Sequence, residues 1–239
     1  MNARGWLALV LAAAAFGGGL AIFLPLSEGA PDAVPRVSDH YIEHAVRETG
    51  AANIVSAVLL DYRAFDTLGE AVVILAAALA VGALLGHGRL PAPGRGLSIL
   101  VRRTLSFLTP LFLLLPAYIV ANGHLSPGGG FQGGVAWATL LMLLAVVYGT
   151  GAPQRLGAPD LLPKIEYAGA GLFLAIGLYG LLRGGAFLAN RAAGFPLGAA
   201  GTLPSAGSIP WLNLAIGAKV MAGMAAIFFY LQRDEETAP

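Results

Sequence analysis

The sequence contains no cysteine and few charged residues among its 239 positions. The absence of cysteine excludes disulfide bonds, thiolate metal sites, iron–sulfur ligation and cysteine nucleophiles within this chain. Asp, Glu, Lys and Arg together make up 11% of the residues, whereas about 25% is usual for a soluble domain. The formal net charge is +1, which gives no indication of a nucleic-acid partner. These shortages point away from a soluble enzyme and from a nucleic-acid-binding protein.

Apolar residues are abundant instead. They form 57% of the chain, and the mean hydropathy is +0.74. Apolar runs of about 20 residues are long enough to cross the hydrocarbon core of a bilayer. The sequence therefore predicts an all-α, polytopic membrane protein with about six transmembrane helices, one of them broken at a glycine-rich loop. The expected spans are Trp6–Leu26, Ala71–Leu85, Thr104–Ala121, Val135–Gly149, Ile165–Leu182 and Trp211–Leu231.

The first span also resembles a signal peptide, but its apolar run is longer than the 7–15 residues of a typical signal-peptide core. Basic residues at Arg4, in the loops 86–103 and 151–164 and at Arg233 recur after every second span. Because basic loops mark the cytoplasmic side, both termini are expected in the cytoplasm. The expected division is a two-helix module at 1–88, an Arg/Pro/Gly linker at 89–103 and a four-helix module at 104–239.

Between the third and fourth spans lies the stretch Asn122–Gly134, in which seven of thirteen residues are Gly or Pro. Both residues destabilise a helix interior, so the stretch is expected to interrupt the chain's helices. It lacks the Gly-Lys-Ser/Thr ending of a phosphate loop. Two interpretations remain: a helix break that lines an ion path, and a tight turn where neighbouring subunits approach each other. The residues of this predicted break are Pro127, Gly128, Gly129, Gly130, Phe131, Gly133 and Gly134.

Two carboxylates, Asp66 and Glu70, stand at the entrance of the second span. Four residues apart, they share one face of a helix. Acids within an apolar span are costly and indicate an ion or proton pathway. Arg63 is expected to neutralise Asp61 or Asp66. The alternative is N-terminal capping of the helix by Asp66.

Lys219 lies near the middle of the last span, too far from either end to reach water easily. It is expected to have a buried partner, which could be Glu166 or an acid of another subunit, and to stabilise or relay charge. Glu166 and Arg183 also suit interfacial anchors. His124, beside the glycine-rich break, is either a loop residue or a titrating group on the ion path.

The spacing His40-x-x-x-His44 would suit zinc. With no third ligand evident, an exposed polar turn is the preferred interpretation. No Ser/His/Asp arrangement or metal cluster is apparent, so the chain is not expected to be an enzyme. Two hypotheses remain open, a chain that contributes ion-path groups and a structural connector that only packs other subunits.

The stretch Asn122–Gly134 and the element Ile216–Val220 resemble the B-type subunit of multisubunit Mrp-type Na⁺/H⁺ antiporters, over about residues 100–232. Upstream, Thr49–Val55 and Leu60–Glu70 are similar to the C-terminal part of the large A-type subunit, which occurs as the separate small E-type subunit of membrane-bound hydrogenases. The chain therefore looks like a fusion of these two neighbours.

This resemblance implies cation/proton exchange across the plasma (inner) membrane, with Na⁺ and H⁺ transported and no cofactor held by this chain. It places the family's acidic pair at Asp66 and Glu70, where it implies transient Na⁺ binding, while Asp61, Arg63, Lys219 and His124 complete the predicted ion path. The implied partners are other membrane subunits and the lipid bilayer. The alternative is an ion-translocating or structural subunit in the membrane arm of a complex I-like respiratory or membrane-bound hydrogenase complex.

Overall fold

The computed structural model describes residues 36–85, 97–149 and 158–232. The chain divides into two compact units, residues 1–40 and 41–239, and the second unit holds the features described below. The expected span Trp6–Leu26, most of the expected linker and the tail after residue 232 lie outside the described residues.

Helices account for every regular element of the described part, which confirms the all-α prediction. Five of these helices are long and apolar enough to cross a membrane, consistent with a multi-pass membrane protein. The elements are α2 (Val37–Thr49), α3 (Ile54–Ala57), the π-helical turn η1 (Val58–Tyr62), α4 (Ala64–Leu85), α5 (Ile99–Ala121), α6 (Gly130–Tyr148), α8 (Ala158–Gly184), the 3-10 turn η2 (Arg191–Ala193) and α9 (Ile209–Leu231).

Several helices begin earlier than their apolar runs suggest. Helix α4 starts at Ala64 rather than Ala71, so that Asp66 and Glu70 lie inside its first two turns. Helix α5 starts at Ile99 and includes Arg102, which the sequence placed in the linker. Helical geometry therefore continues through charged residues at the ends of apolar runs, because packing rather than hydropathy decides where a helix begins.

The glycine-rich break is shorter than predicted. Helix α5 ends at Ala121 and α6 begins at Gly130, so that only residues 122–129 are non-helical. The expectation that the whole stretch up to Gly134 interrupts the helices is therefore wrong. Gly133 and Gly134 are helical and buried, since contacts with neighbouring helices outweigh the low helix propensity of glycine.

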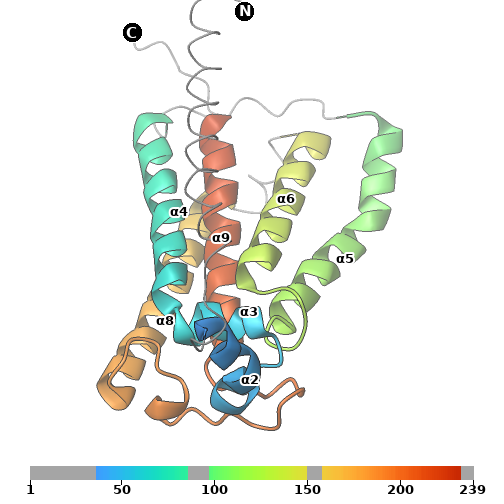
Figure 1. Cartoon of the computed structure of the whole chain (residues 1–239). Helices are drawn as coiled ribbons and strands as arrows, with labels where there is room; N and C mark the ends of the chain where they lie inside the picture. Colours follow the sequence, from blue (N-terminus) through green and yellow to red (C-terminus); the bar gives the residue numbers. More distant parts are fainter. Residues whose placement is uncertain (1–35, 86–96, 150–157, 233–239) are drawn as a thin grey trace, which may run out of the picture. The chain divides into compact units, whose positions relative to one another are not determined.

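Helix α5 runs without interruption through Pro110 and Pro116. Figure 1 shows that the helix changes direction along its length. Each proline removes one backbone donor and clashes with the preceding turn, which bends a helix.

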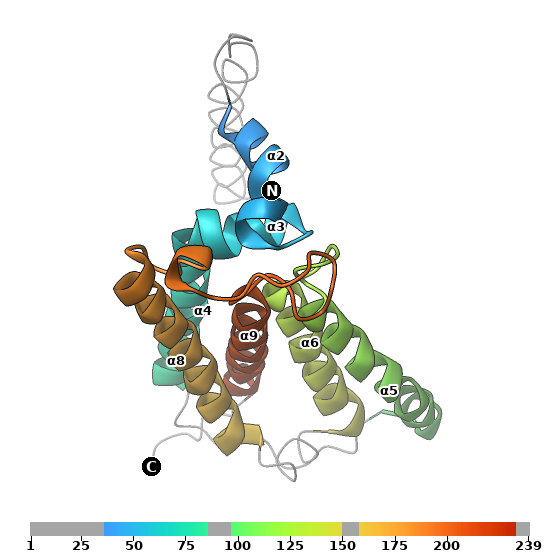
Figure 2. The same ribbon diagram turned by 90° about the horizontal axis from the view of Figure 1, so that it is seen from below.

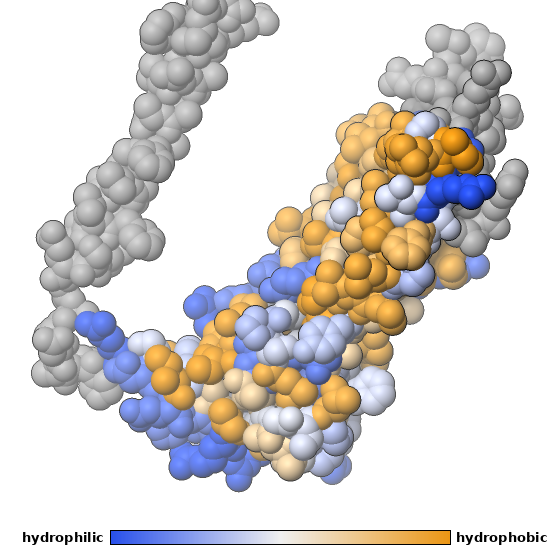
Figure 3. Space-filling model, turned by 90° about the vertical axis from the view of Figure 1, so that its right-hand side faces the viewer, coloured by the Kyte–Doolittle hydropathy of each residue, from blue (hydrophilic) through white to orange (hydrophobic). Residues whose placement is uncertain are grey.

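Helix α9 lies at the centre of the other long helices, as the end-on view in Figure 2 shows. It is also the most buried of the five candidate spans: 56% of its most apolar 18-residue stretch is buried, against 6% of that stretch in α4. Small residues permit this packing: a Cβ added to Gly134 would lie 2.7 Å from the carbonyl oxygen of Gly217, and one added to Gly169 would lie 2.6 Å from that of Ala215. On the face shown in Figure 3, hydrophobic residues cover the long helices.

The glycine-rich break, α3 and the long loop before α9 gather at one end of these helices (Figure 1). The side chain of Asn53 donates hydrogen bonds to the carbonyl oxygens of Gly123 (2.7 Å) and Ser126 (2.9 Å). Asn190 donates to the carbonyl oxygen of Thr49 at 3.3 Å. Asparagine side chains thus hold three separate segments together at this end.

Candidate functional site

A cavity of about 270 Å³ lies beside the glycine-rich break, between the segment 55–60 and helices α4, α6 and α9. Much of its wall is apolar, with Leu59, Leu60 and Ile216 among its residues. Backbone of the break and several polar side chains interrupt this apolar wall. The polar side chains that line it are Ser56, Thr67, Glu70, Gln132 and Asn213.

Glu70 supplies the negatively charged group of this cavity. It is the seventh residue of α4, so its Cα lies about 9 Å along the axis from the start of the helix. Thr67, one turn earlier, donates its hydroxyl to the carbonyl oxygen of Leu59 at 2.6 Å. This bond holds the start of α4 against the turn that precedes it, and thereby places Glu70 beside the break.

Asp66 does not line the cavity with Glu70. Its Oδ2 lies 2.8 Å from Nη2 of Arg63, and both side chains are exposed (43% and 59%). Arg63 therefore neutralises Asp66 rather than Asp61. The capping interpretation is wrong, because α4 begins at Ala64 and Asp66 stands inside the first turn. An acid there interacts favourably with the helix dipole.

The break forms the opposite wall through backbone that only glycine can provide. Gly128 and Gly129 have φ values of +153° and +143°, which favour glycine strongly. The N–H of Gly130 donates to Oδ1 of Asn213 at 2.9 Å. A Cβ on Gly130 would collide with the backbone of Asn213, and one on Gly133 with the side chain of Val120. The break therefore combines close packing with a cavity wall.

Lys219 lies midway along α9 and is 2% exposed, so it does not reach water along its stem. Its Nζ lies 3.8 Å from Oε1 of Glu166 and donates a hydrogen bond to the carbonyl oxygen of Ala71. Glu166 is 4% exposed, so its interpretation as an interfacial anchor is wrong. A Cβ added to Gly223 would lie 2.7 Å from Oε1 of Glu166, so the carboxylate packs directly against this glycine.

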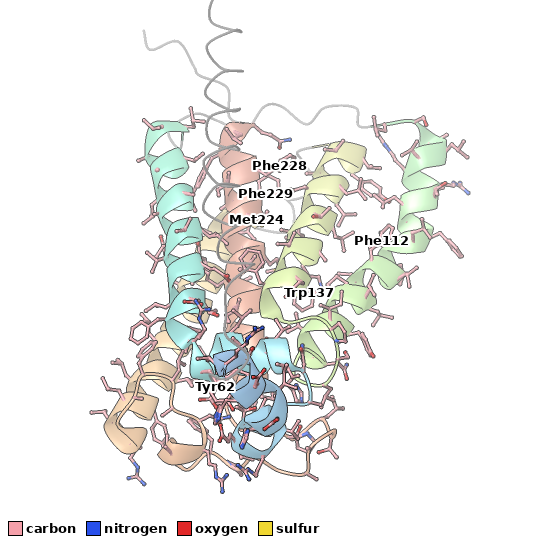
Figure 4. All side chains as sticks on the ribbon, viewed as in Figure 1. Tyr62, Phe112, Trp137, Met224, Phe228 and Phe229 are labelled. Carbon is pink, nitrogen blue, oxygen red and sulfur yellow. The ribbon has the colours of Figure 1, made fainter. Side chains whose placement is uncertain are left out.

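Asp61 and His124 stand at the loop end, apart from the cavity lining. Burial and the nearby Glu48 carboxylate raise the pKa of Asp61 to about 6, against hydrogen bonds from Asn190 that lower it. Tyr62, labelled in Figure 4, donates its hydroxyl to Glu48 at 2.6 Å. Burial and this carboxylate raise the pKa of the Tyr62 hydroxyl above its ordinary value.

His124 is completely buried. Its Nε2 lies 3.1 Å from the carbonyl oxygen of Leu203, and a carbonyl can only accept, so Nε2 carries the hydrogen. The backbone oxygen of His124 accepts from the N–H of Asn53 at 3.0 Å. Burial lowers the pKa of the ring. In this setting His124 fastens the break to the two neighbouring loops.

Sequence reasoning missed Asn213. It is a polar residue inside an apolar span, which is the criterion that singled out Lys219, and it is 2% exposed. Gln132 was missed because it stood inside a stretch interpreted only as a break. No cluster of three or more His, Asp or Glu side chains suited to a metal ion occurs in the part of the chain that the structure describes.

A bundle of long apolar helices that holds a lysine–glutamate pair and a carboxylate-lined cavity defines a multi-pass membrane protein with charged groups in its interior. Two matches to models of known protein families identify the family within this class. The chain belongs to the family described as "Domain related to MnhB subunit of Na+/H+ antiporter", whose model matches residues 100–226. Residues 5–96 match a second family model, MbhE, which describes the E-type subunit of MBH. The resemblance to a B-type antiporter subunit with an E-type segment ahead of it is thereby confirmed.

Relatives and solved structures agree with this family. The chain is 28% identical over 261 residues to the probable K(+)/H(+) antiporter A/B subunit of Rhizobium meliloti, covering 97% of this chain and 25% of that protein. It superposes on a chain of the membrane-bound sulfane sulfur reductase, an archaeal respiratory membrane complex, with a TM-score of 0.76 and 30% identity, covering 97% and 100% of the two chains.

The same fold occurs in the Mrp complex from Dietzia sp. DQ12-45-1b, with a TM-score of 0.71 and 25% identity. All of this chain is covered there, but only 27% of the Dietzia chain. The chain therefore spans about a quarter of the Rhizobium meliloti and Dietzia proteins, and the full length of the respiratory-complex chain.

Proposed function

We propose that this chain is a membrane subunit of a multisubunit cation/proton antiporter and that Glu70 lies on its cation path. The observation that carries the proposal is the position of Glu70 on the wall of a cavity of about 270 Å³ between the helices. An acidic side chain at such a position is expected to serve an ion or proton pathway.

In the proposed mechanism, Glu70 binds a monovalent cation and a proton in turn. Hard cations prefer oxygen ligands, and the lining offers the amide oxygen of Gln132 and the hydroxyl of Ser56 besides the carboxylate. The Arg63–Asp66 pair stands at the exposed side of α4. This ion pair is proposed to shape the electrostatic field through which cations approach Glu70. Na⁺ is the proposed cation, with K⁺ as the alternative.

Other membrane subunits are the proposed partners, together with the lipid bilayer. In the most apolar 18-residue stretch of α4 only 6% is buried, and the first two turns of the helix carry two exposed acids, Asp66 and Glu70. Lipid would solvate such charges poorly, whereas a neighbouring subunit could neutralise them. We further propose cytoplasmic termini, on the basis of the basic loops, and the division into modules 1–88 and 104–239 joined by the linker 89–103.

The test is Glu70→Gln in the assembled complex, with Glu43→Gln on the exposed face of α2 as the matched control. Everted membrane vesicles report exchange as a pH change after addition of NaCl or KCl. Glu70→Gln is expected to abolish the cation-dependent pH change, and Glu43→Gln to leave it intact. Undiminished exchange in Glu70→Gln vesicles, with the complex intact on a native gel, would contradict the proposal and favour the structural-connector hypothesis.

A second candidate function is that of a subunit in the membrane arm of a respiratory complex. It is favoured by the superposition on the sulfane sulfur reductase chain, which is covered over its whole length. Purification of the native complex followed by mass spectrometry separates the two candidates. Co-purified iron–sulfur or other redox subunits would support the respiratory complex, whereas membrane subunits alone would support the antiporter.

A further inference from the structure

Helix α9 carries two buried polar side chains, and they are bonded to two different helices, α6 and α4, that contribute residues to the Glu70 cavity. Oδ1 of Asn213 accepts the N–H of Gly130 at the start of α6. Nζ of Lys219 donates to the carbonyl oxygen of Ala71, the residue that follows Glu70 in α4. Helix α6 begins at the glycine-rich break and α4 carries the Glu70 carboxylate, so α9 is bonded to the helices of both walls.

The geometry of α9 allows it to reach both walls. Asn213 and Lys219 are six residues apart, which corresponds to about 9 Å along the axis and about 240° around it. The two side chains therefore leave α9 toward different neighbours. Figure 2 shows α9 between α4 on one side and α6 on the other. Ile216, halfway between the two, lines the cavity and also a smaller hollow of about 90 Å³ beside Lys219.

Neither bond stabilises α9 itself. The N–H of Gly130 is one of the four at a helix N-terminus that have no partner within the helix, and Asn213 supplies that partner from outside. Lys219 places a charged donor against α4 and is 2% exposed. Such a charge requires compensation in the interior, and Glu166 of α8 provides it at 3.8 Å.

We propose that Asn213 and Lys219 are positioning residues that set the separation between Glu70 and the glycine-rich break, and thereby the size of the cation that the cavity accepts. Glu166 keeps the Lys219 ammonium compensated while it holds α4. The inference rests on the proposed function, in which Glu70 binds the cation. Selectivity among hard cations depends on the size and rigidity of the oxygen-lined site, so a looser pair of walls favours the larger ion.

The first experiment measures cation dependence in everted vesicles that contain the assembled complex. The variants are Asn213→Leu and the double variant Lys219→Met/Glu166→Leu, which removes both charges together because single removal leaves the other charge buried and unpaired. Lys164→Met, an exposed lysine on α8, is the matched control. Glu70→Gln is measured in parallel.

Both variants are expected to raise the half-saturating Na⁺ concentration severalfold and to lower the preference for Na⁺ over K⁺, while the maximal rate changes much less. A merely structural role would reduce the amount of assembled complex and leave both the half-saturating Na⁺ concentration and the preference for Na⁺ over K⁺ unchanged. Unchanged half-saturation and preference in assembled complexes would overturn the inference, provided that Glu70→Gln is inactive. An active Glu70→Gln complex would instead refute the proposed function.

A second measurement tests the positioning without transport. The chain has no cysteine of its own, so spin labels can be attached at Val73→Cys on the exposed face of α4 and at Thr139→Cys on α6. The label-to-label distance in the complex is expected to become longer and more broadly distributed in the Lys219→Met/Glu166→Leu background. The same distance distribution with and without the two substitutions would overturn the inference, whatever the transport assay shows.

Discussion

Nζ of Lys219 lies 3.8 Å from Oε1 of Glu166 in the interior of the bundle. Within the described residues, that carboxylate oxygen has no hydrogen-bond partner, while the ammonium donates to the backbone of α4. The pair therefore compensates charge without forming a close hydrogen bond. Each partner makes the burial of the other tolerable.

This relationship predicts an asymmetry between single and double substitutions. Lys219→Met leaves a buried carboxylate unpaired and is expected to destabilise the protein by about 3–5 kcal/mol. Lys219→Met/Glu166→Leu replaces both charges with apolar groups and is expected to recover most of that loss. Thermal unfolding of the purified complex measures both effects. Equal stability of the single and double variants would show that the two charges are not coupled.

The glycines of the break and α6 predict a second set of results. Gly130→Ala and Gly133→Ala force a methyl group into the backbone of Asn213 and the side chain of Val120. Overpacking of this kind costs about 1–3 kcal/mol, so less assembled complex is expected on native gels. Gly171 of α8 has no heavy atom near its added Cβ, which makes Gly171→Ala the matched control.

Gly171→Ala is expected to be neutral or to stabilise α8 by up to about 1 kcal/mol, the difference in helix propensity between the two residues. If all three alanine variants behaved alike, the effect would belong to glycine flexibility in general, and the close approach of α6 to its neighbours would not be its cause.

The positions of Glu70 and Lys219 show how far the sequence could go. Both were singled out because a charged group in an apolar run is rare and needs a reason, and the structure gives each a defined environment, a cavity for Glu70 and a buried partner for Lys219. Glu166 was harder to place, because a charge three residues beyond Pro163 is also typical of a helix end at the membrane surface.

Other features depended on contacts that no local pattern contains. Leu60 of the π-helical turn η1 and Ala64 at the start of α4 lie in one hydrophobic cluster with residues of α9. The residue types of Gly130–Gly134 predicted a helix break, yet these residues are helical. A Cβ on Gly130 or Gly134 would collide with α9, and one on Gly133 would collide with α5. The cavity itself joins residues 55–70 with two distant segments, 128–132 and 213–216, so its existence required the tertiary structure.

Asn190 predicts a strong effect far from the cavity. It is 1% exposed, donates to the carbonyl oxygens of Thr49 and Ala206, and accepts from the N–H and hydroxyl of Ser208. Asn190→Ala leaves several of these buried groups unsatisfied, at about 1–3 kcal/mol for each. The melting temperature of the complex is expected to fall clearly, whereas Asn122→Ala, which removes one bond at an exposed helix end, changes it little.

The protonation of Asp61 predicts how stability depends on pH. Burial raises the pKa of Asp61 from 3.8 to about 6 in the folded protein, so the folded state holds the proton more tightly than the unfolded state does. Its stabilising contribution is fully present below pH 3.8 and is lost as pH rises through about 6. Above that range, the folded protein carries a partly buried carboxylate at a constant cost on the order of 3 kcal/mol.

Asp61→Asn mimics the protonated side chain and removes this loss. The variant is expected to melt at a higher temperature than the wild type near neutral pH, and the difference should shrink steadily toward about pH 4. Glu43→Gln, an exposed acid on α2, serves as the control and should show no comparable trend. A difference between Asp61→Asn and wild type that stays constant from acid to neutral pH would mean that Asp61 does not titrate in this range, and that hydrogen bonding to Asn190 rather than burial governs its charge.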